Sequence, residues 1–288
     1  MKLIEPNVQE ITNFEGVDNF YKAVARAARI CYASDKTTDD KELCAILIEK
    51  KHFSPFEHAI ITIKESYEEE KTDFFADLYN NIYNNNYTII PDGKDYISIN
   101  GRVLIESIIK AKDSNLIINS TIKLIDLVLE HLKERDINVP TFKSFIVDTS
   151  IGCAREMNRH HDNFYIVEQS TRYCNFSKDK FGNEVAFNKP YWIIGDILKD
   201  EVYNQSYPEW YQSLVYSESK YFNMLNEGVP IDIARGVLPL DTHTRAIYTA
   251  TLEEWQHIID LRLKGTTGKP HGDIMIIADK IDKLINNK

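Results

Sequence analysis

Residues 155–172 read REMNRHHDNFYIVEQSTR, a basic segment, an apolar run and a polar turn in succession. Arg155 and Arg159 are four residues apart, so they share one face if the segment is helical. Two cations on one face suit a phosphate or an electron-rich ring. The last three residues, from Ser170 to Arg172, offer a hydroxyl, backbone N–H groups and a guanidinium, which together can surround a phosphate. The stretch therefore indicates a helix followed by an anion-binding turn.

Plainer interpretations of the same stretch stay open. The arginines and histidines also fit a solvated helix end, where cations lie near the negative end of the helix dipole. A zinc site could use His160 and His161 with Cys153 and Cys174. Adjacent histidines point in different directions on a helix, and no second pair of ligands has metal spacing, so we expect no metal.

The arginines are unevenly distributed along the chain. Only ten are present against 24 lysines, and six of the ten fall within residues 155–172 and 235–262. Because a guanidinium fits phosphate and carboxylate, these windows suggest two halves of one anion site, with scattered surface salt bridges as the alternative. The formal net charge of −10 argues against a broad basic surface, so we expect no nucleic-acid partner.

Composition and length define the class of protein. The chain has 288 residues, 43% hydrophobic and 27% charged, which is typical of a globular protein with a sizeable core. No apolar stretch is long enough to span a membrane, and the start from Met1 to Pro6 is unlike a secretory signal. We therefore expect a cytoplasmic protein with no membrane partner. The four cysteines form no C-x-x-C pair, which favours reduced thiols.

Hydrophobic periodicity predicts an alternation of helices and strands with one irregular region. Residues 65–100 contain an acidic patch from Glu68 to Glu70 and an Asn/Tyr-rich stretch, so they look like an insertion or flexible excursion outside the core. The predicted helices cover about 19–32, 39–51, 101–112, 120–134, 150–160, 196–227, 230–236, 251–263 and 272–286, and the predicted strands cover about 60–63 and 141–147.

The helix at 251–263 carries a charge on an apolar stripe. Thr251 and Glu254 have the spacing of a capping box at its start. Trp255, Ile258 and Arg262 then lie along one face. Arg262 thus extends a buried stripe, where a guanidinium needs a partner or a ligand, although it could also be an exposed residue serving the helix dipole.

Several segments, in order along the chain, resemble motifs of the flavin-dependent thymidylate synthase family. The similarity covers about two thirds of the chain, and residues 170–184, STRYCNFSKDKFGNE, match almost letter for letter the segment after the family's signature in some members. The other matching segments are ARAAR at 25–29, HFSPFEH at 52–58, NGR at 100–102, ARGVLPL at 234–240 and WQHIIDLR at 255–262.

The resemblance implies a fold and a reaction. The fold is α/β (α+β), a single domain over residues 1–288 with a central sheet flanked by helices and a helical insertion at about 65–140. Family members form homotetramers in which several subunits build each active site. They methylate C5 of dUMP to give dTMP, with methylenetetrahydrofolate as the carbon donor, FAD as the cofactor and NADPH as the reductant, and they use no cysteine nucleophile.

The resemblance also implies the roles of individual residues. The dUMP phosphate meets Ser170, the backbone of Thr171, and Arg172, and Arg235 joins from another subunit. Arg262 approaches the uracil base and His52 lies near the flavin ring, so these two are the expected catalytic residues. Glu156 and Glu168 belong to the substrate site. The expected FAD ligands are Ser54, Glu57, Arg159, His160, His161, Thr251 and His257.

Three departures from the family pattern fall within this expected site. The signature R-H-R, seven residues, Ser appears as Arg159-His160-His161 with eight residues before Ser170. His161 thereby removes a permanent cation from a flavin-binding position. Glu156 places a carboxylate where a neutral base-recognition group is usual, and the family's A-H-P-Q ending appears as residues 268–273, GKPHGD. Two alternatives therefore remain: C5 methylation or hydroxymethylation of another uridine nucleotide, and a non-catalytic nucleotide-binding paralogue.

Overall fold

The computed structural model describes residues 1–12, 14–34, 37–64, 73–91, 94–111, 121–139, 141–194 and 201–286. Its helices are α1 (Phe20–Cys31), α2 (Asp40–Glu49), α3 (Asp73–Tyr83), α4 (Gly101–Ala111), α5 (Thr121–Leu132), α6 (Ile151–Met157), α7 (Glu201–Asn226), α8 (Ile231–Ala234), α9 (Leu252–Arg262) and α10 (Gly272–Asn286). Its strands are β1 (Lys2–Ile4), β2 (Asn7–Ile11), β3 (Ile60–Lys64), β4 (Tyr96–Asn100), β5 (Phe142–Ser150), β6 (Phe164–Glu168), β7 (Ala186–Asn188) and β8 (His243–Thr251).

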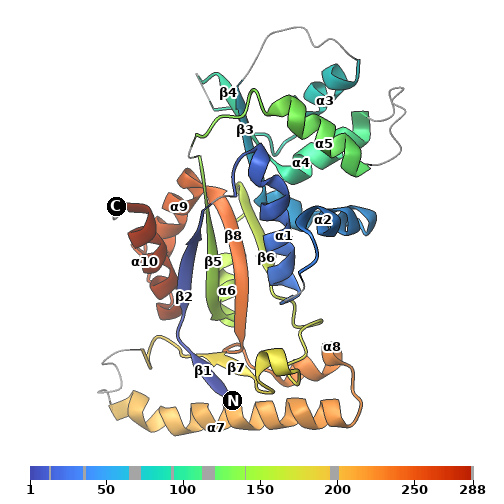
Figure 1. The fold of residues 1–288 in the computed structure, drawn as a ribbon. Coiled ribbons are helices and arrows are strands. Elements are labelled where there is room, and N and C mark those ends of the chain that lie inside the picture. The colour runs from blue at the N-terminus through green and yellow to red at the C-terminus, as the bar shows by residue number, and fades with distance from the viewer. Residues whose placement is uncertain are drawn as a thin grey trace.

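A four-stranded antiparallel sheet with the order β2-β5-β8-β6 forms the centre of the molecule (Figure 1). The long strand β8 pairs with β5 from His243 to Thr251 and with β6 from Ala246 to Ala250. Two smaller sheets flank it, β3 with β4 at one end and β1 with β7 at the other. The predicted mixed architecture, with a central sheet flanked by helices, is confirmed.

The two faces of the sheet pack against different helices, because successive side chains of a strand point to opposite sides. Phe145 and Tyr248 join the apolar cluster formed with α6, α9 and α10. Tyr165 and Ile247 point the other way, into the cluster that contains α1. Figure 1 shows α9 and α10 on one side of the sheet and α1 on the other, with α7 lying across the end near β1 and β7.

Helix starts follow strand ends at two points that matter for the site. The Ser150 side chain accepts a hydrogen bond from the backbone of Cys153 at 3.1 Å, so it caps α6 directly after β5. Thr251 does the same for α9 directly after β8, accepting from the backbone of Glu254 at 3.2 Å. The expectation of a cap at Thr251 is therefore confirmed, and both helices leave the sheet in fixed directions.

The insertion contributes to the core, contrary to the expectation for residues 65–100. Phe74, Leu78 and Ile82 of α3 and Ile97 and Ile99 of β4 are buried in the same cluster as α1. Their apolar spacing is helical in α3 and alternating in β4, but it is hidden among Asn and Tyr residues. The prediction of a segment outside the core is therefore wrong. The acidic patch at 68–70 lies outside the described residues.

The remaining predictions have mixed outcomes. The predicted helices within the described residues are present, and α10 has the predicted bounds. The strand expected at 141–147 extends to Ser150, and most other strands were not predicted. In the described part of the chain, no helix is long and apolar enough to cross a membrane. The single-domain organisation over 1–288 stays a prediction.

His58 gives the fold a specific acid sensitivity. Its side chain is fully buried, its Nδ1 lies 2.9 Å from Thr249 Oγ1, and its Nε2 has no partner among the described residues. Burial lowers the pKa of His58 to about 3. Because the unfolded chain then binds one more proton below pH ~6.5, the free energy of unfolding falls as the pH drops below that value, by about 1.4 kcal/mol per pH unit.

Denaturant unfolding between about pH 7.5 and about pH 5 tests this expectation. His58→Gln keeps a polar partner for Thr249 but cannot be protonated. We expect this variant to be less stable than the parent at neutral pH and to lose stability less steeply on acidification. An equally steep loss in both proteins would show that His58 does not cause the sensitivity.

Candidate functional site

The site forms at the end of the sheet where β8 begins. Because β5 and β6 run antiparallel to β8, their last residues, Ser150 and Glu168, both lie near its first residues. Helix α6 leaves from the end of β5, and the turn after Glu168 leaves from the end of β6. The segment 235–242 arrives at the same place on its way into β8. Three segments that are far apart in sequence are thus brought together.

These segments enclose a cleft of about 630 Å³, here called the phosphate cleft. Its volume is within the range of small-molecule sites, roughly 300–1,000 Å³. Four residues expected at the substrate, Glu168, Ser170, Thr171 and Arg235, line it. The other lining residues are Ile151, Arg155, Asn158, Gln169, Gly236, Leu238, Pro239 and Leu240. The structure thus assembles most of the expected phosphate-binding residues in one place.

Hydrogen bonds fix the donors of the phosphate cleft. Arg235 Nη1 donates to Thr171 Oγ1 at 2.8 Å, so this arginine reaches the turn within its own chain. The expectation that Arg235 joins the site from another subunit stays a prediction, since the contact seen here lies within one chain. The backbone N–H of Ser170 donates to the Cys31 carbonyl at 2.9 Å, and the backbone N–H groups of Tyr173 and Cys174 donate to the Ser170 carbonyl. The turn is therefore fixed by one hydrogen bond to the end of α1 and by two hydrogen bonds of its own.

Glu168 provides the single carboxylate of this cleft among its described lining residues. Thr244 Oγ1 donates to its Oε1 at 2.9 Å and Asn158 Nδ2 approaches its Oε2 at 3.3 Å. Tyr248 in turn donates to Asn158 Oδ1 at 3.2 Å. These contacts hold the carboxylate in place in the cleft, where it can accept hydrogen bonds from a ligand's hydroxyl or amide groups.

Arg172 lies outside the lining of the phosphate cleft. Its guanidinium is exposed and lies over the Tyr173 ring at 5.7 Å, and the Tyr173 ring is 5.5 Å from that of Tyr32. The Tyr32 hydroxyl is 3.2 Å from Nδ1 of His52. The expected catalytic residue His52 is therefore linked to Arg172 by aromatic contacts, although neither enters the cleft.

A second group of expected residues surrounds His160. The Arg262 Nε donates to His160 Nε2 at 3.3 Å, and the Arg262 guanidinium also contacts Glu156, with 3.8 Å between Nη1 and Oε2. Glu254 Oε1 lies 3.3 Å from His160 Nδ1. We call Glu156, His160, Glu254 and Arg262 the Arg262 cluster. Arg262 therefore has the partners that its place on the apolar stripe requires.

The charges in the Arg262 cluster determine the protonation of His160. Burial, followed by the positive charge of Arg262, lowers the pKa of His160 to about 4, so the imidazole is neutral near pH 7. Because Nε2 accepts from Arg262, the proton of this neutral ring is on Nδ1, facing Glu254. Burial raises the pKa of Glu254. The cluster therefore presents one permanent cation next to a neutral ring.

A third group lies near the expected flavin ligands Glu57 and His161. Both line a cleft of about 260 Å³ together with His160, Phe164 and Arg102. Arg102 Nη1 donates to Glu57 Oε1 at 2.7 Å, and burial raises the pKa of Glu57 despite this contact. Cationic, imidazole and aromatic groups suit the anionic and ring parts of a flavin, but this volume can enclose only a fragment of one.

The other expected flavin ligands are spread over the surface. Ser54 begins the short 3₁₀ helix Ser54–His58, and Arg159 is exposed. Thr251 caps α9, and the His257 ring is 6.1 Å from that of His160. The flavin-binding roles of these four residues stay predictions. Within the described residues, no group of three or more His, Cys, Asp or Glu residues has the geometry to hold a metal ion.

Sequence reasoning did not assign several residues that the structure places at these sites. The sequence places Arg155 on one face of a helix. Its position in the phosphate cleft depends on the capped start of α6, which the sequence does not show. Arg102 is paired with Glu57, which only the insertion's position reveals. His271 Nδ1 lies 3.8 Å from Glu156 Oε1, from the segment that departs from the family pattern.

A family model matches most of this chain. The model of the thymidylate synthase complementing protein family matches residues 86–288, well over half of the chain. The chain therefore belongs to the thymidylate synthase complementing protein family. The match includes the phosphate cleft and the Arg262 cluster but begins after His52, Ser54 and Glu57.

Two individual relatives share modest sequence identity with this chain. The chain is 28% identical over 137 residues to a probable flavin-dependent thymidylate synthase of Paramecium bursaria Chlorella virus 1, covering 46% of this chain and 62% of the relative. It is 28% identical over 145 residues to a flavin-dependent thymidylate synthase of Pyrococcus furiosus, covering 50% of this chain and 55% of the relative. The matches thus span less than two thirds of either relative's length.

Among solved structures, a UMP/dUMP methylase, PolB from Streptomyces cacaoi bound with 5-Br dUMP, aligns with 99% of this chain and 91% of its own. The sequence identity is 17% and the TM-score is 0.45. A second structure of the same protein, bound with 5-Br UMP, gives 16% identity and a TM-score of 0.47.

Proposed function

We propose that this chain is a flavin-dependent methyltransferase that converts dUMP to dTMP, with methylenetetrahydrofolate as the carbon donor and NADPH as the reductant. The observation that carries the proposal is the phosphate cleft, in which Arg235 and Thr171 are hydrogen-bonded and which Ser170 and Glu168 also line. Membership of the family supports the reaction class. A nucleoside monophosphate fits a cleft lined by arginines and by a hydrogen-bonded carboxylate.

In this proposal the phosphate cleft binds and orients the nucleotide. Arg235, the Ser170 hydroxyl and the backbone of Thr171 hold the phosphate, and Glu168 accepts from the sugar or base. Arg262 acts on the pyrimidine, where a cation stabilises negative charge that develops as C5 becomes nucleophilic. Because Arg262 is not among the lining residues of the phosphate cleft, we infer that copies of this chain combine in a homotetramer to complete each site.

The cofactor in this proposal is FAD, which supplies the hydride when it is bound and reduced. The groups of this chain that hold it are Glu57, Arg159, His160, His161 and His257, with Ser54, Thr251 and His52 nearby. The fragment-sized cleft at Glu57 and His161 agrees with a cofactor shared between subunits, because one chain encloses too little of it. Arg102 also lines this cleft, with its guanidinium paired with Glu57 and Glu106.

Visible absorption of the purified protein tests the proposal directly. We expect a flavin spectrum, present as purified or after incubation with FAD, that bleaches on anaerobic addition of NADPH. With dUMP and methylenetetrahydrofolate the product should be dTMP, identified by its mass. A protein that binds dUMP but stays colourless after incubation with FAD would instead support the non-catalytic paralogue.

Removing the charge of Arg235 tests the phosphate cleft. Arg235→Gln should weaken dUMP binding by about tenfold to a hundredfold, since a charge-assisted hydrogen bond contributes roughly 1.5–3 kcal/mol. Isothermal titration of the folded protein with dUMP measures the effect. Lys123→Gln removes an equal charge from an exposed position on α5 and should leave binding unchanged. Equal affinities in all three proteins would place the phosphate elsewhere.

A second candidate function follows from Glu156. Its carboxylate lies 3.8 Å from Arg262 and 3.8 Å from His271, so it partly neutralises the cation that acts on the base. A carboxylate at this place can also accept a hydrogen bond from the ligand. The alternative is therefore C5 modification, by a methyl or hydroxymethyl group, of another uridine nucleotide.

Glu156→Gln separates the two candidates. If dUMP is the substrate, freeing Arg262 should raise kcat/KM for dUMP several-fold, in line with the ~1 kcal/mol value of a partly exposed ion pair. If Glu156 selects another nucleotide, the variant should lose activity on that nucleotide, for which UMP is the first probe. Glu253→Gln, at an exposed position on α9, is the matched control.

A further inference from the structure

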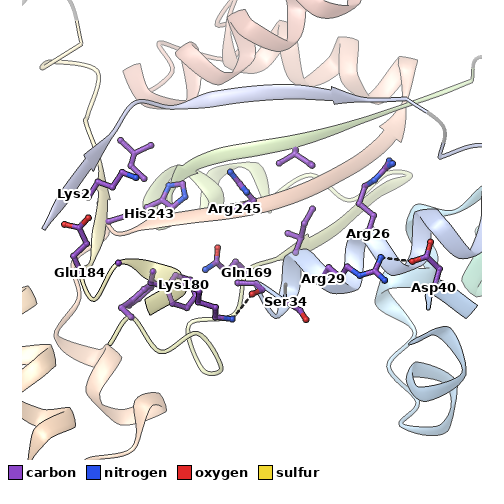
Figure 2. Close-up of a pocket in the computed structure, with 18 of the residues that line it drawn as sticks. Lys2, Arg26, Arg29, Ser34, Asp40, Gln169, Lys180, Glu184, His243 and Arg245 are labelled. Carbon is purple, nitrogen blue, oxygen red and sulfur yellow. Dashed lines mark hydrogen bonds and ion pairs between the residues drawn. The ribbon is translucent and has the colours of Figure 1, made fainter. Parts of the chain in front are cut away.

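A second cleft, of about 840 Å³, lies on the face of the central sheet that α1 covers. We call it the cationic cleft, after six side chains that line it: Lys2, Lys22, Arg26, Arg29, Lys180 and Arg245. They come from β1, α1, the loop before β7, and β8 (Figure 2). A chain with a net charge of −10 therefore concentrates cations from four separate segments around one cavity.

Carboxylates balance only part of this charge. Two of them, Asp40 and Glu184, line the cleft. Asp40 accepts from Arg29 at 2.7 Å, and Glu184 lies 3.1 Å from the amino terminus. Arg245 is paired with Asp148, with 2.7 Å between Nε and Oδ1. The other four cations, Lys2, Lys22, Arg26 and Lys180, form no ion pair with any described residue.

Arg26 is the cation whose environment most requires an anion. It lies on α1 between buried alanines, and its guanidinium has one long hydrogen bond, 3.3 Å to the Thr12 carbonyl. Burial lowers the pKa of Arg26, with only a partial offset from the charge of Asp40. A partly buried charge with so few partners is costly unless a ligand pairs with it.

The shape of the cleft indicates an extended ligand. In Figure 2, Lys2 and Glu184 lie at one end and Arg26, Arg29 and Asp40 at the other, with Arg245 and Lys180 between them. The cations are therefore spread along the cleft. Apolar side chains also line the cleft, namely Ile4, Ile30, Ile146, Phe176 and Phe181. The volume fits a small organic molecule.

We propose that the cationic cleft is a second ligand site, separate from the phosphate cleft, that binds an extended polyanion with three or more negative groups. Such a chain of charges occurs in an oligophosphate and in a run of glutamate carboxylates, and both suit guanidinium and ammonium groups. Of the described residues, the two clefts share only Gln169 in their linings. The site does not depend on the function proposed for the phosphate cleft.

The test is isothermal titration calorimetry of the purified full chain, with inorganic tripolyphosphate and, separately, with triglutamate. Saturating dUMP is present, so that the phosphate cleft is filled. Lys22→Gln/Arg26→Gln removes two unpaired cations from α1. Lys110→Gln/Lys123→Gln removes two exposed lysines from α4 and α5 and is the charge-matched control. The two arms distinguish a phosphate source from a carboxylate source.

We expect at least one probe to bind despite dUMP, and the α1 variant to bind it on the order of a hundredfold more weakly, about tenfold for each cation. The control should match the parent protein, and raised salt should weaken binding. Binding that dUMP abolishes, or that both variants weaken equally, would overturn the proposal. The proposal would also be overturned if neither probe bound and the α1 variant had a changed oligomeric state. The cleft would then be an interface between copies of this chain.

Discussion

The pairing of β8 with both β5 and β6 is the constraint on which the rest of the structure depends. It brings the ends of β5 and β6 to the start of β8, where α6, the 169–173 turn and the 235–242 segment meet. At its other end β8 runs into Thr251, which caps α9. Helix α9 packs back along the sheet, so that Arg262, at its last turn, reaches α6. A shift of register in β8 would move both groups of functional residues together.

The Arg262 cluster shows how burial and pairing can fix one tautomer. His160 is placed between Arg262, whose Nε donates a hydrogen bond to Nε2, and Glu254, whose carboxylate faces Nδ1. A protonated imidazole would face a guanidinium at 3.3 Å inside a partly buried site, so the ring stays neutral. Because the ring is neutral, the negative charge that pairs with Arg262 comes from Glu156. The cluster is therefore stable in the folded chain, and a ligand must compete with Glu156 for the guanidinium.

The sequence predicted the helices better than the strands, for a physical reason. Helical stripes such as Trp255, Ile258 and Ile259 are visible within one segment. Strand β8 carries its apolar residues on both faces, because helices cover both sides of the sheet, so it lacks a simple alternation. Strand β6 is short and follows a basic segment, and its place was evident only from pairing with β8.

The residues expected at the substrate could be named from the sequence as a set, but their partners could not. Residue chemistry indicated the turn at Ser170 and Thr171, motif resemblance added Arg235, and the structure brings the three together. The resemblance could not give the contact of Arg102 with Glu57, because that contact depends on how the insertion folds onto Ser54–His58. The cationic cleft was equally hidden. Three of its cations lie within residues 22–29, but the other three, Lys2, Lys180 and Arg245, come from distant parts of the chain.

Gln169 lines both clefts and forms the wall between them. This wall determines how a ligand in one cleft can influence a ligand in the other. The backbone N–H of Gln169 donates to the Arg245 carbonyl at 2.8 Å, and that of Ser170 donates to Cys31 at 2.9 Å. Both bonds tie the wall to packed elements, so a ligand on one side cannot easily change the shape of the other side. Charge acts across such a wall, because a fixed, partly buried separation is poorly screened. A polyanion in the cationic cleft would therefore weaken phosphate binding beside Arg235 through repulsion, while a neutral ligand of the same shape would not.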